Sequence, residues 1–139
     1  IEINTREHFS ILGLQGIPFE VNSTWFTGTA TINTYCLEEL LGTKLRALYQ
    51  RRKGRDLFDM YWAIKHNNID VVKVLDCYRK YMDFVVDKAP TQKQFLANME
   101  EKMQDNEFLS DMRDIIRPGI EYSPEAAWEL VKTQLIDRL

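Results

Sequence analysis

The stretch from Leu37 to Trp62 places the strongest constraint on how this chain can fold. Gly54 is predicted to end a first helix, because glycine takes the left-handed conformation common at helix C-termini without steric cost. Asp56 is predicted to cap a second helix, with Asp59 in its first turn. The stretch therefore predicts two helices joined by a tight turn. The first helix is indicated by leucines at i, i+3, i+4 spacing, namely Leu37, Leu40, Leu41, Leu45 and Leu48.

The predicted turn is rich in cations, and they have two interpretations. In the first, the cations satisfy the last carbonyls of the first helix and favour its dipole, and Asp56 is only a cap. In the second, they bind phosphate, because arginine offers a fork of donors and lysine a compact charge. Lys44 would then lie nearly in line with Arg51 on the first helix, and Asp56 or Asp59 would orient a cation, hold a metal or move a proton. The residue types leave both interpretations open. The cations of the turn are Arg51, Arg52, Lys53 and Arg55.

The flanking sequence predicts an α+β fold that is mainly α. Residues 19–25 and 29–35 alternate as short strands, with Gly28 between them as a hairpin turn or bulge. The first five residues also alternate, which indicates a strand there. After Trp62, apolar stripes with capping residues predict further helices, so that residues 37–139 form a bundle of about five to six helices. These later helices are expected over 71–86, from Thr91, over 106–117 and from Ser123.

Composition narrows the class of protein. The 139 residues are 45% hydrophobic and 28% charged, as in an ordinary globular domain rather than a disordered chain. The net charge of −3 argues against a surface coated with basic groups, so any nucleic-acid contact must come from a local patch. Cys36 and Cys77 have no metal-ligand spacing and are interpreted as reduced, buried thiols. No apolar run is long enough to span a membrane, and a cytoplasmic location is the default expectation.

The central stretch resembles the distal motifs of the AbiEii/AbiGii-type nucleotidyltransferase toxins. It contains a Lys-Leu-x-x-Leu helix that begins at Lys44, followed by an Arg-Asp-x-x-Asp turn at Arg55, Asp56 and Asp59. The resemblance implies that residues 1–36 are edge strands of a nucleotidyltransferase-like sheet and that residues 37–139 form a helical domain carrying the motifs. It also implies a toxin of a toxin–antitoxin or phage-defence system, with a cognate antitoxin as partner.

The resemblance implies roles for individual residues. Lys44 and Arg55 would neutralise the breaking triphosphate, and transfer RNA is among the acceptors known for such enzymes. Glu2 would be a third carboxylate for Mg²⁺ beside an Asp pair, although a solvent-facing Glu on an ordinary strand gives the same pattern. The catalytic candidates are Lys44, Asp56 and Asp59, and the phosphate-binding candidates are Lys44, Arg51, Arg52 and Arg55.

Two motifs expected of a complete nucleotidyltransferase are missing from the sequence. There is no Gly-rich loop at a helix start to bind phosphates, and no Asp-x-Asp pair to hold Mg²⁺ ions. We therefore expect the chain to be the distal part of such an enzyme and not to transfer nucleotides by itself. Two other classes stay open from the residues: an RNA-binding helical module without chemistry, and a structural or partner-binding domain.

Overall fold

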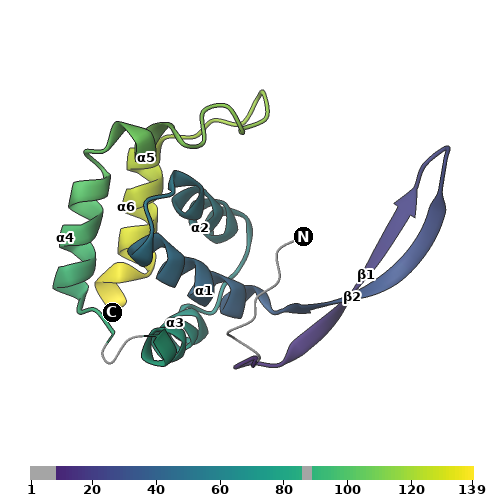
Figure 1. The fold of residues 1–139 in the computed structure, drawn as a ribbon, viewed down its shortest axis with the longest axis horizontal. Coiled ribbons are helices and arrows are strands. Elements are labelled where there is room, and N and C mark those ends of the chain that lie inside the picture. Colours follow the sequence, from purple (N-terminus) through teal and green to yellow (C-terminus); the bar gives the residue numbers. More distant parts are fainter. Residues whose placement is uncertain (1–8, 86–88) are drawn as a thin grey trace.

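The computed structural model describes residues 9–85 and 89–139, and helices make up most of them. Figure 1 shows the helices gathered into one body, with a long β-hairpin projecting from it. The predicted α+β, mainly α class is confirmed. None of the described helices is long and apolar enough to cross a membrane. The elements are β1 (Leu14–Asn22), β2 (Thr27–Tyr35), α1 (Leu37–Gln50), α2 (Gly54–His66), α3 (Val71–Val85), α4 (Gln92–Lys102), α5 (Asn106–Ser110), α6 (Pro124–Gln134) and the short 3-10 helix η1 (Ile136–Arg138).

The hairpin confirms both predicted strands but not the place of the turn. β1 and β2 pair antiparallel from Leu14 opposite Tyr35 to Asn22 opposite Thr27, so the turn covers residues 23–26. Gly28 lies inside β2, and the prediction that it forms the turn is wrong. The ring of Phe26 occupies the space beside it, 2.7 Å from where a Cβ would stand.

The hairpin is amphipathic, and both of its faces are largely exposed. Opposed residues of an antiparallel pair share a face and successive residues alternate, so the register separates an apolar face from a polar one. Among the described residues the sheet has two strands, and its assignment to a nucleotidyltransferase-like sheet stays a prediction. The predicted strand over the first five residues, with Glu2, lies outside the described residues. The apolar face carries Ile17, Phe19, Val21, Ala30 and Ile32, and the polar face Glu20, Thr29, Thr31 and Asn33.

Helix α1 packs against α3 at the centre of the core. Leu41, Leu45 and Leu48 of the predicted stripe are buried, with exposed fractions of 3%, 0% and 0%, whereas Leu37 is partly buried and Leu40 is exposed. Gly42 allows the helices to approach closely, because a Cβ there would lie 2.6 Å from the Cβ of Cys77. Burial raises the pKa of Cys77 to about 11, and this free thiol is buried as predicted, whereas the free thiol of Cys36 is only partly buried. The division of the chain at residue 36 stays a prediction.

The turn between α1 and α2 differs from the prediction in two ways. α1 ends at Gln50, and Gly54 is the first residue of α2 rather than a left-handed stop. The reason is tertiary: a Cβ on Gly54 would lie 2.2 Å from the carbonyl oxygen of Phe108 in α5. Asp56 is not the N-cap either, because Lys53 holds that position without a side-chain bond. The carboxylate of Asp56 instead accepts from Lys44 of α1 and from Arg51, the residue after α1.

The starts of the later helices agree with the sequence, whereas one of their lengths does not. Thr91 forms the expected capping box with Gln94, and Ser123 accepts from the amide of Ala126. The helix expected over 106–117 is wrong in extent, because α5 stops at Ser110 and residues 111–116 form successive turns. Asp111, the C-cap of α5, accepts a hydrogen bond from the backbone N–H of Arg55, 3.0 Å away.

A buried carboxylate ties the start of the described chain to the core. Glu39 of α1 is fully buried. It accepts hydrogen bonds from the backbone N–H groups of Ile11 at 2.7 Å and Leu12 at 2.9 Å. The hydroxyls of Ser10 and Tyr81 also donate to it, at 2.9 and 2.7 Å. Burial raises the pKa of Glu39, but these bonds outweigh burial and leave its pKa below the usual value.

Replacement of Glu39 with glutamine should lower the free energy of unfolding by about 2 kcal/mol at pH 7, because four donors lose a charged acceptor. A lowered pKa means that the unfolded chain takes up a proton first as the pH falls. The contribution of Glu39 is therefore complete above its unfolded pKa and is lost as the pH falls through its folded pKa. Urea unfolding of both proteins from pH 7 to pH 3 measures this. A stability difference that does not shrink in acid would contradict the role of the charge.

Candidate functional site

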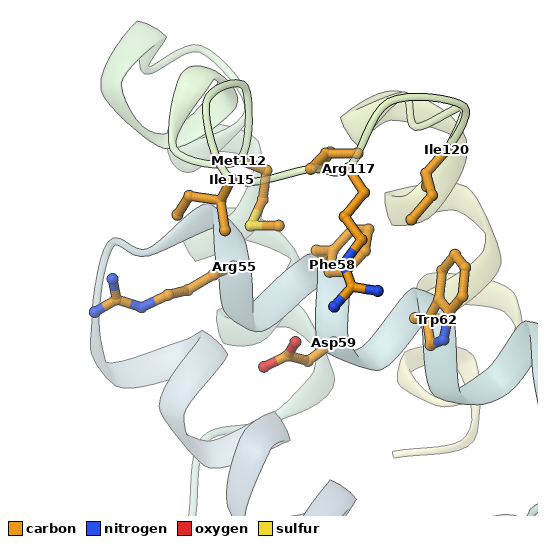
Figure 2. Close-up of a pocket in the computed structure, with 9 residues that line it drawn as sticks. Arg55, Phe58, Asp59, Trp62, Met112, Ile115, Arg117 and Ile120 are labelled. Atoms are coloured by element: carbon orange, nitrogen blue, oxygen red, sulfur yellow. The ribbon is translucent and has the colours of Figure 1, made fainter. Parts of the chain in front are cut away.

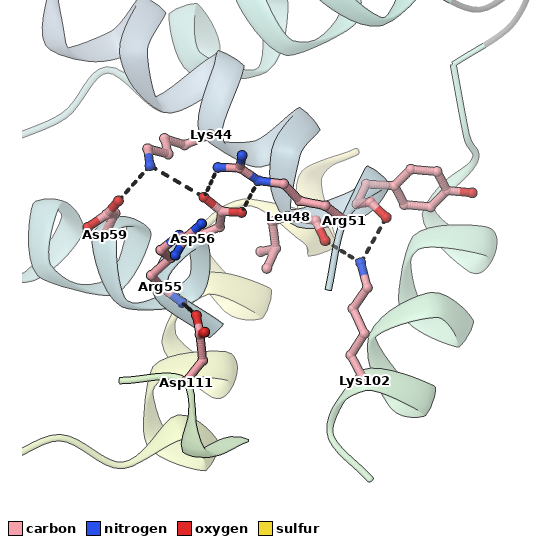
Figure 3. A network of polar contacts seen from close by, with 9 residues as sticks. Lys44, Leu48, Arg51, Arg55, Asp56, Asp59, Lys102 and Asp111 are labelled. Atoms are coloured by element: carbon pink, nitrogen blue, oxygen red, sulfur yellow. Dashed lines mark hydrogen bonds and ion pairs between the residues drawn. The ribbon is translucent and has the colours of Figure 1, made fainter. Parts of the chain in front are cut away.

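The predicted motif residues of α1 and α2 converge on one buried carboxylate. The oxygens of Asp56 accept from Nε and Nη2 of Arg51, at 2.7 and 2.8 Å. Nζ of Lys44 lies 3.3 Å from Asp56 and 2.7 Å from Asp59 (Figure 3). Asp56 is fully buried, whereas the side chains of Lys44, Asp59 and Arg51 are 35%, 44% and 50% exposed. We call Lys44, Arg51, Asp56 and Asp59 the Asp56 cluster.

Helix geometry explains why these residues meet. Lys44 lies in α1, whereas Arg51 directly follows its last residue in an extended conformation, with its backbone N–H still bonded to the carbonyl oxygen of Ala47. The prediction that one continuous helix carries both cations is therefore wrong for Arg51, although the seven-residue spacing, about two turns, keeps it near the same side. The connector 51–53 turns the chain back, so that the start of α2 lies beside the end of α1 (Figure 3). Asp56 lies in the first turn of α2, where the helix dipole also favours a negative charge. The cluster is therefore specified by the two helices and their short connector together.

The other cations of the predicted turn do not contact Asp56. Arg52 pairs with Glu101 and with Asp105, and Lys53 lies 3.9 Å from Glu107. The structure records no ion pair for the guanidinium of Arg55 within residues 9–85 and 89–139. Phosphate binding by Arg52 stays a prediction, and the carboxylates beside it would have to give way. This pairing also weakens the case for an RNA-binding module built on the connector.

Lys102, which the sequence analysis missed, satisfies the end of α1. Its ammonium group donates to the carbonyl oxygens of Leu48 and, at 2.8 Å, of Tyr49 (Figure 3). The side chain is 2% exposed, and burial lowers its pKa to about 8. The prediction that the connector cations satisfy these carbonyls is therefore wrong for Leu48 and Tyr49. Lys102, the last residue of α4, donates to them instead. A lysine in the last turn of a helix is ordinary, so the sequence held no signal for this contact.

A pocket of about 470 Å³ adjoins the cluster on the far side of Asp59. α2 forms one wall, and the segment 112–120 covers it (Figure 2). Arg117 reaches from this segment toward α2, whereas the guanidinium of Arg55 points outward at the other end. The pocket thus combines apolar walls with charged groups at its rim. It is lined by Arg55, Phe58, Asp59, Trp62, Met112, Ile115, Ile116, Arg117 and Ile120.

The cluster does not suit Mg²⁺. Both oxygens of Asp56 are bonded to cations, and Asp56 has no exposed surface to share with an ion. The described ranges contain no group of three or more His, Cys, Asp or Glu residues that could hold a metal. Glu2, the predicted metal ligand, lies outside them. The contribution of Asp56 is therefore to hold Lys44 and Arg51 in place.

Comparison with known proteins assigns the chain to a family. The family model described as nucleotidyl transferase AbiEii toxin, Type IV TA system, matches residues 1–133. The chain therefore belongs to the AbiEii family of nucleotidyltransferase toxins, and the resemblance stated from the motifs is confirmed. Neither a curated protein nor a solved structure matches it. The Asp56 cluster and its neighbouring pocket lie entirely within the matched range.

Proposed function

We propose that the Asp56 cluster binds the polyphosphate of a nucleoside triphosphate during nucleotidyl transfer. The observation that carries the proposal is the buried carboxylate of Asp56, which fixes two partly exposed cations side by side, Lys44 of α1 and Arg51 of the connector. A fully buried charge is costly unless paired, and here the pairing orients cations that solvent still reaches. Such a pre-oriented pair can stabilise charge that develops on a leaving phosphate.

The proposed roles of the residues follow from how exposed their side chains are. Lys44 has three N–H donors, and an incoming anion can displace Asp59 from it because both side chains are partly exposed. Arg55 adds a cation without an ion partner in the described part of the chain. Asp56 is a positioning residue, since it is buried and bonded to the cations. Asp59, once released from Lys44, is the carboxylate that can orient the acceptor hydroxyl.

The reaction is an attack by the acceptor hydroxyl on the α-phosphorus. The new P–O bond forms as the bond between the α-phosphorus and the oxygen bridging to the β-phosphate breaks, and the hydroxyl proton passes to the carboxylate of Asp59. Pyrophosphate leaves with its charge neutralised by Lys44 and Arg55. Mg²⁺ and a transfer RNA acceptor remain part of the proposal, and carboxylates outside the described residues, Glu2 among them, would hold the metal. Without an Asp-x-Asp pair in its sequence, the chain alone is proposed not to complete the transfer. A cognate antitoxin is the partner that membership of a toxin–antitoxin family implies.

Replacement of Lys44 with alanine should weaken binding of a labelled nucleoside triphosphate by about tenfold or more, because a charge-assisted contact to phosphate is lost. Calorimetric titration of the chain measures the affinity, and circular dichroism confirms the fold. Lys73→Ala is the matched control, because Lys73 is a surface lysine paired with Asp70 on α3. Unchanged triphosphate affinity in a folded Lys44→Ala protein would remove the basis of the proposal.

A further inference from the structure

The pocket beside Asp59 combines an apolar interior with cations at its rim. Phe58 and Trp62 line it from α2, and Met112, Ile115 and Ile120 line it from the covering segment. The structure records no hydrogen bond or ion pair for the guanidinium groups of Arg55 and Arg117 within the described ranges. An anion with an apolar body is the complementary ligand.

The covering segment explains why the pocket is open. Residues 111–116 leave the helical path after α5, and Gly119 takes a positive φ of 92° before the chain enters α6. This path carries Arg117 over α2, where its guanidinium lies between Asp59 and Trp62 in the view of Figure 2. Arg113, from the same segment, lines a different depression beside Pro124. The segment therefore directs one arginine into the pocket and another away from it.

We propose that this pocket binds a nucleotide, with its base against the apolar walls and its phosphate on Arg117. The inference rests on the proposed function, because the pocket and the Asp56 cluster share Asp59. Two ligands would present such a nucleotide: the incoming nucleoside triphosphate, or the acceptor strand with its terminal nucleotide. Arg55, at the outer end, is placed to meet a further phosphate of either ligand.

The dimensions and polar groups suit a nucleotide. The volume of about 470 Å³ lies in the range of small-molecule sites, about 300–1,000 Å³. Phe58 and His66 stack on Trp62 at centroid distances of 5.7 and 4.0 Å, so a base meets the edge of the indole and the isoleucines. The indole N–H of Trp62 is a donor that the edge of a base can accept from.

Intrinsic fluorescence tests the inference on the 139-residue chain. Trp25 is 95% exposed in the hairpin turn and Trp128 is buried, so Trp25→Phe leaves Trp62 as the exposed reporter. The probes are AMP, CMP, GMP and UMP, with ribose 5-phosphate as the ligand without a base. We expect quenching by nucleotides and none by ribose 5-phosphate. Arg117→Ala should weaken nucleotide binding by about tenfold, and the matched control Arg113→Ala should leave it unchanged.

Several outcomes would overturn the inference: no nucleotide binding, equal binding of ribose 5-phosphate, or equal losses from the two arginine variants. Tighter binding of a nucleoside triphosphate than of a short oligoribonucleotide assigns the pocket to the incoming nucleotide, and the reverse assigns it to the acceptor. Lys44→Ala separates this inference from the proposed function. It should weaken binding of a nucleoside triphosphate far more than binding of nucleoside monophosphates, because Lys44 does not line the pocket. Loss of triphosphate binding in that variant concerns the cluster alone.

Discussion

Replacement of Gly54 with alanine should destabilise the protein by about 3 kcal/mol, the upper end of the usual cost of overpacking a core. A glycine inside a helix normally costs stability, so local propensity predicts the opposite sign, a gain of up to about 1 kcal/mol. The structure reverses that expectation. A Cβ at this position would lie 2.2 Å from the carbonyl oxygen of Phe108 and 3.2 Å from the Cβ of Asp111. Because the first contact is backbone, α5 must move away from the start of α2.

Thermal unfolding measures the effect, which corresponds to a fall in Tm of about 10 °C for a domain of this size. Hydrogen exchange localises it, because the amide of Arg55 should lose its protection when Asp111 moves away. Arg55→Ala is the control, since this neighbouring side chain is exposed and unpaired among the described residues. A Gly54→Ala protein as stable as the wild type would show that α5 does not dock on α2 as described.

Replacement of Lys102 with alanine should also cost about 3 kcal/mol. The change removes a buried aliphatic stem and leaves the carbonyls of Leu48 and Tyr49 without their charged donor. These carbonyls end α1 just before Arg51, so the connector should loosen as well. Lys102→Met keeps the stem and should recover part of the loss. Urea unfolding of the three proteins separates packing from hydrogen bonding. Equal stability of the alanine variant and the wild type would be inconsistent with the buried contact.

The dependence on pH identifies the ammonium group itself. The pKa of Lys102 is lowered to about 8 in the folded protein, so above pH 8 the unfolded chain binds more protons than the folded one. The contribution of Lys102 to the free energy of unfolding should therefore rise by about 1 kcal/mol between pH 7 and pH 9. Cys77 acts in the opposite direction, since its pKa is raised to about 11. The difference between wild type and Lys102→Met cancels the cysteine, and a difference independent of pH would contradict the assignment.

Periodicity and capping predicted most of the helical body. The leucine stripe of α1 and the caps at Thr91 and Ser123 are local signals, because each depends only on residues of the same helix or next to it in the sequence. These elements are therefore found where the sequence analysis expected them.

The errors have a common cause in contacts between segments distant in sequence. Gly54 was predicted as a helix stop from its local conformational freedom, but its role is to admit the backbone of α5. Asp56 was predicted as a cap, yet Lys44 and Arg51 compete successfully for its carboxylate. Neither Lys102 nor Arg117 carried a motif. Their neighbours are known only once the end of α4 and the segment after α5 are placed in space.

Each residue of the connector 51–53 forms an ion pair with a different part of the fold. Its three consecutive side chains pair with Asp56 of α2, with Glu101 near the end of α4 and with Glu107 of α5. Within three residues the connector is thus joined by ion pairs to three other parts of the fold. A substitution at Glu101 or Glu107, about fifty positions downstream, therefore removes a partner of the connector that holds Arg51.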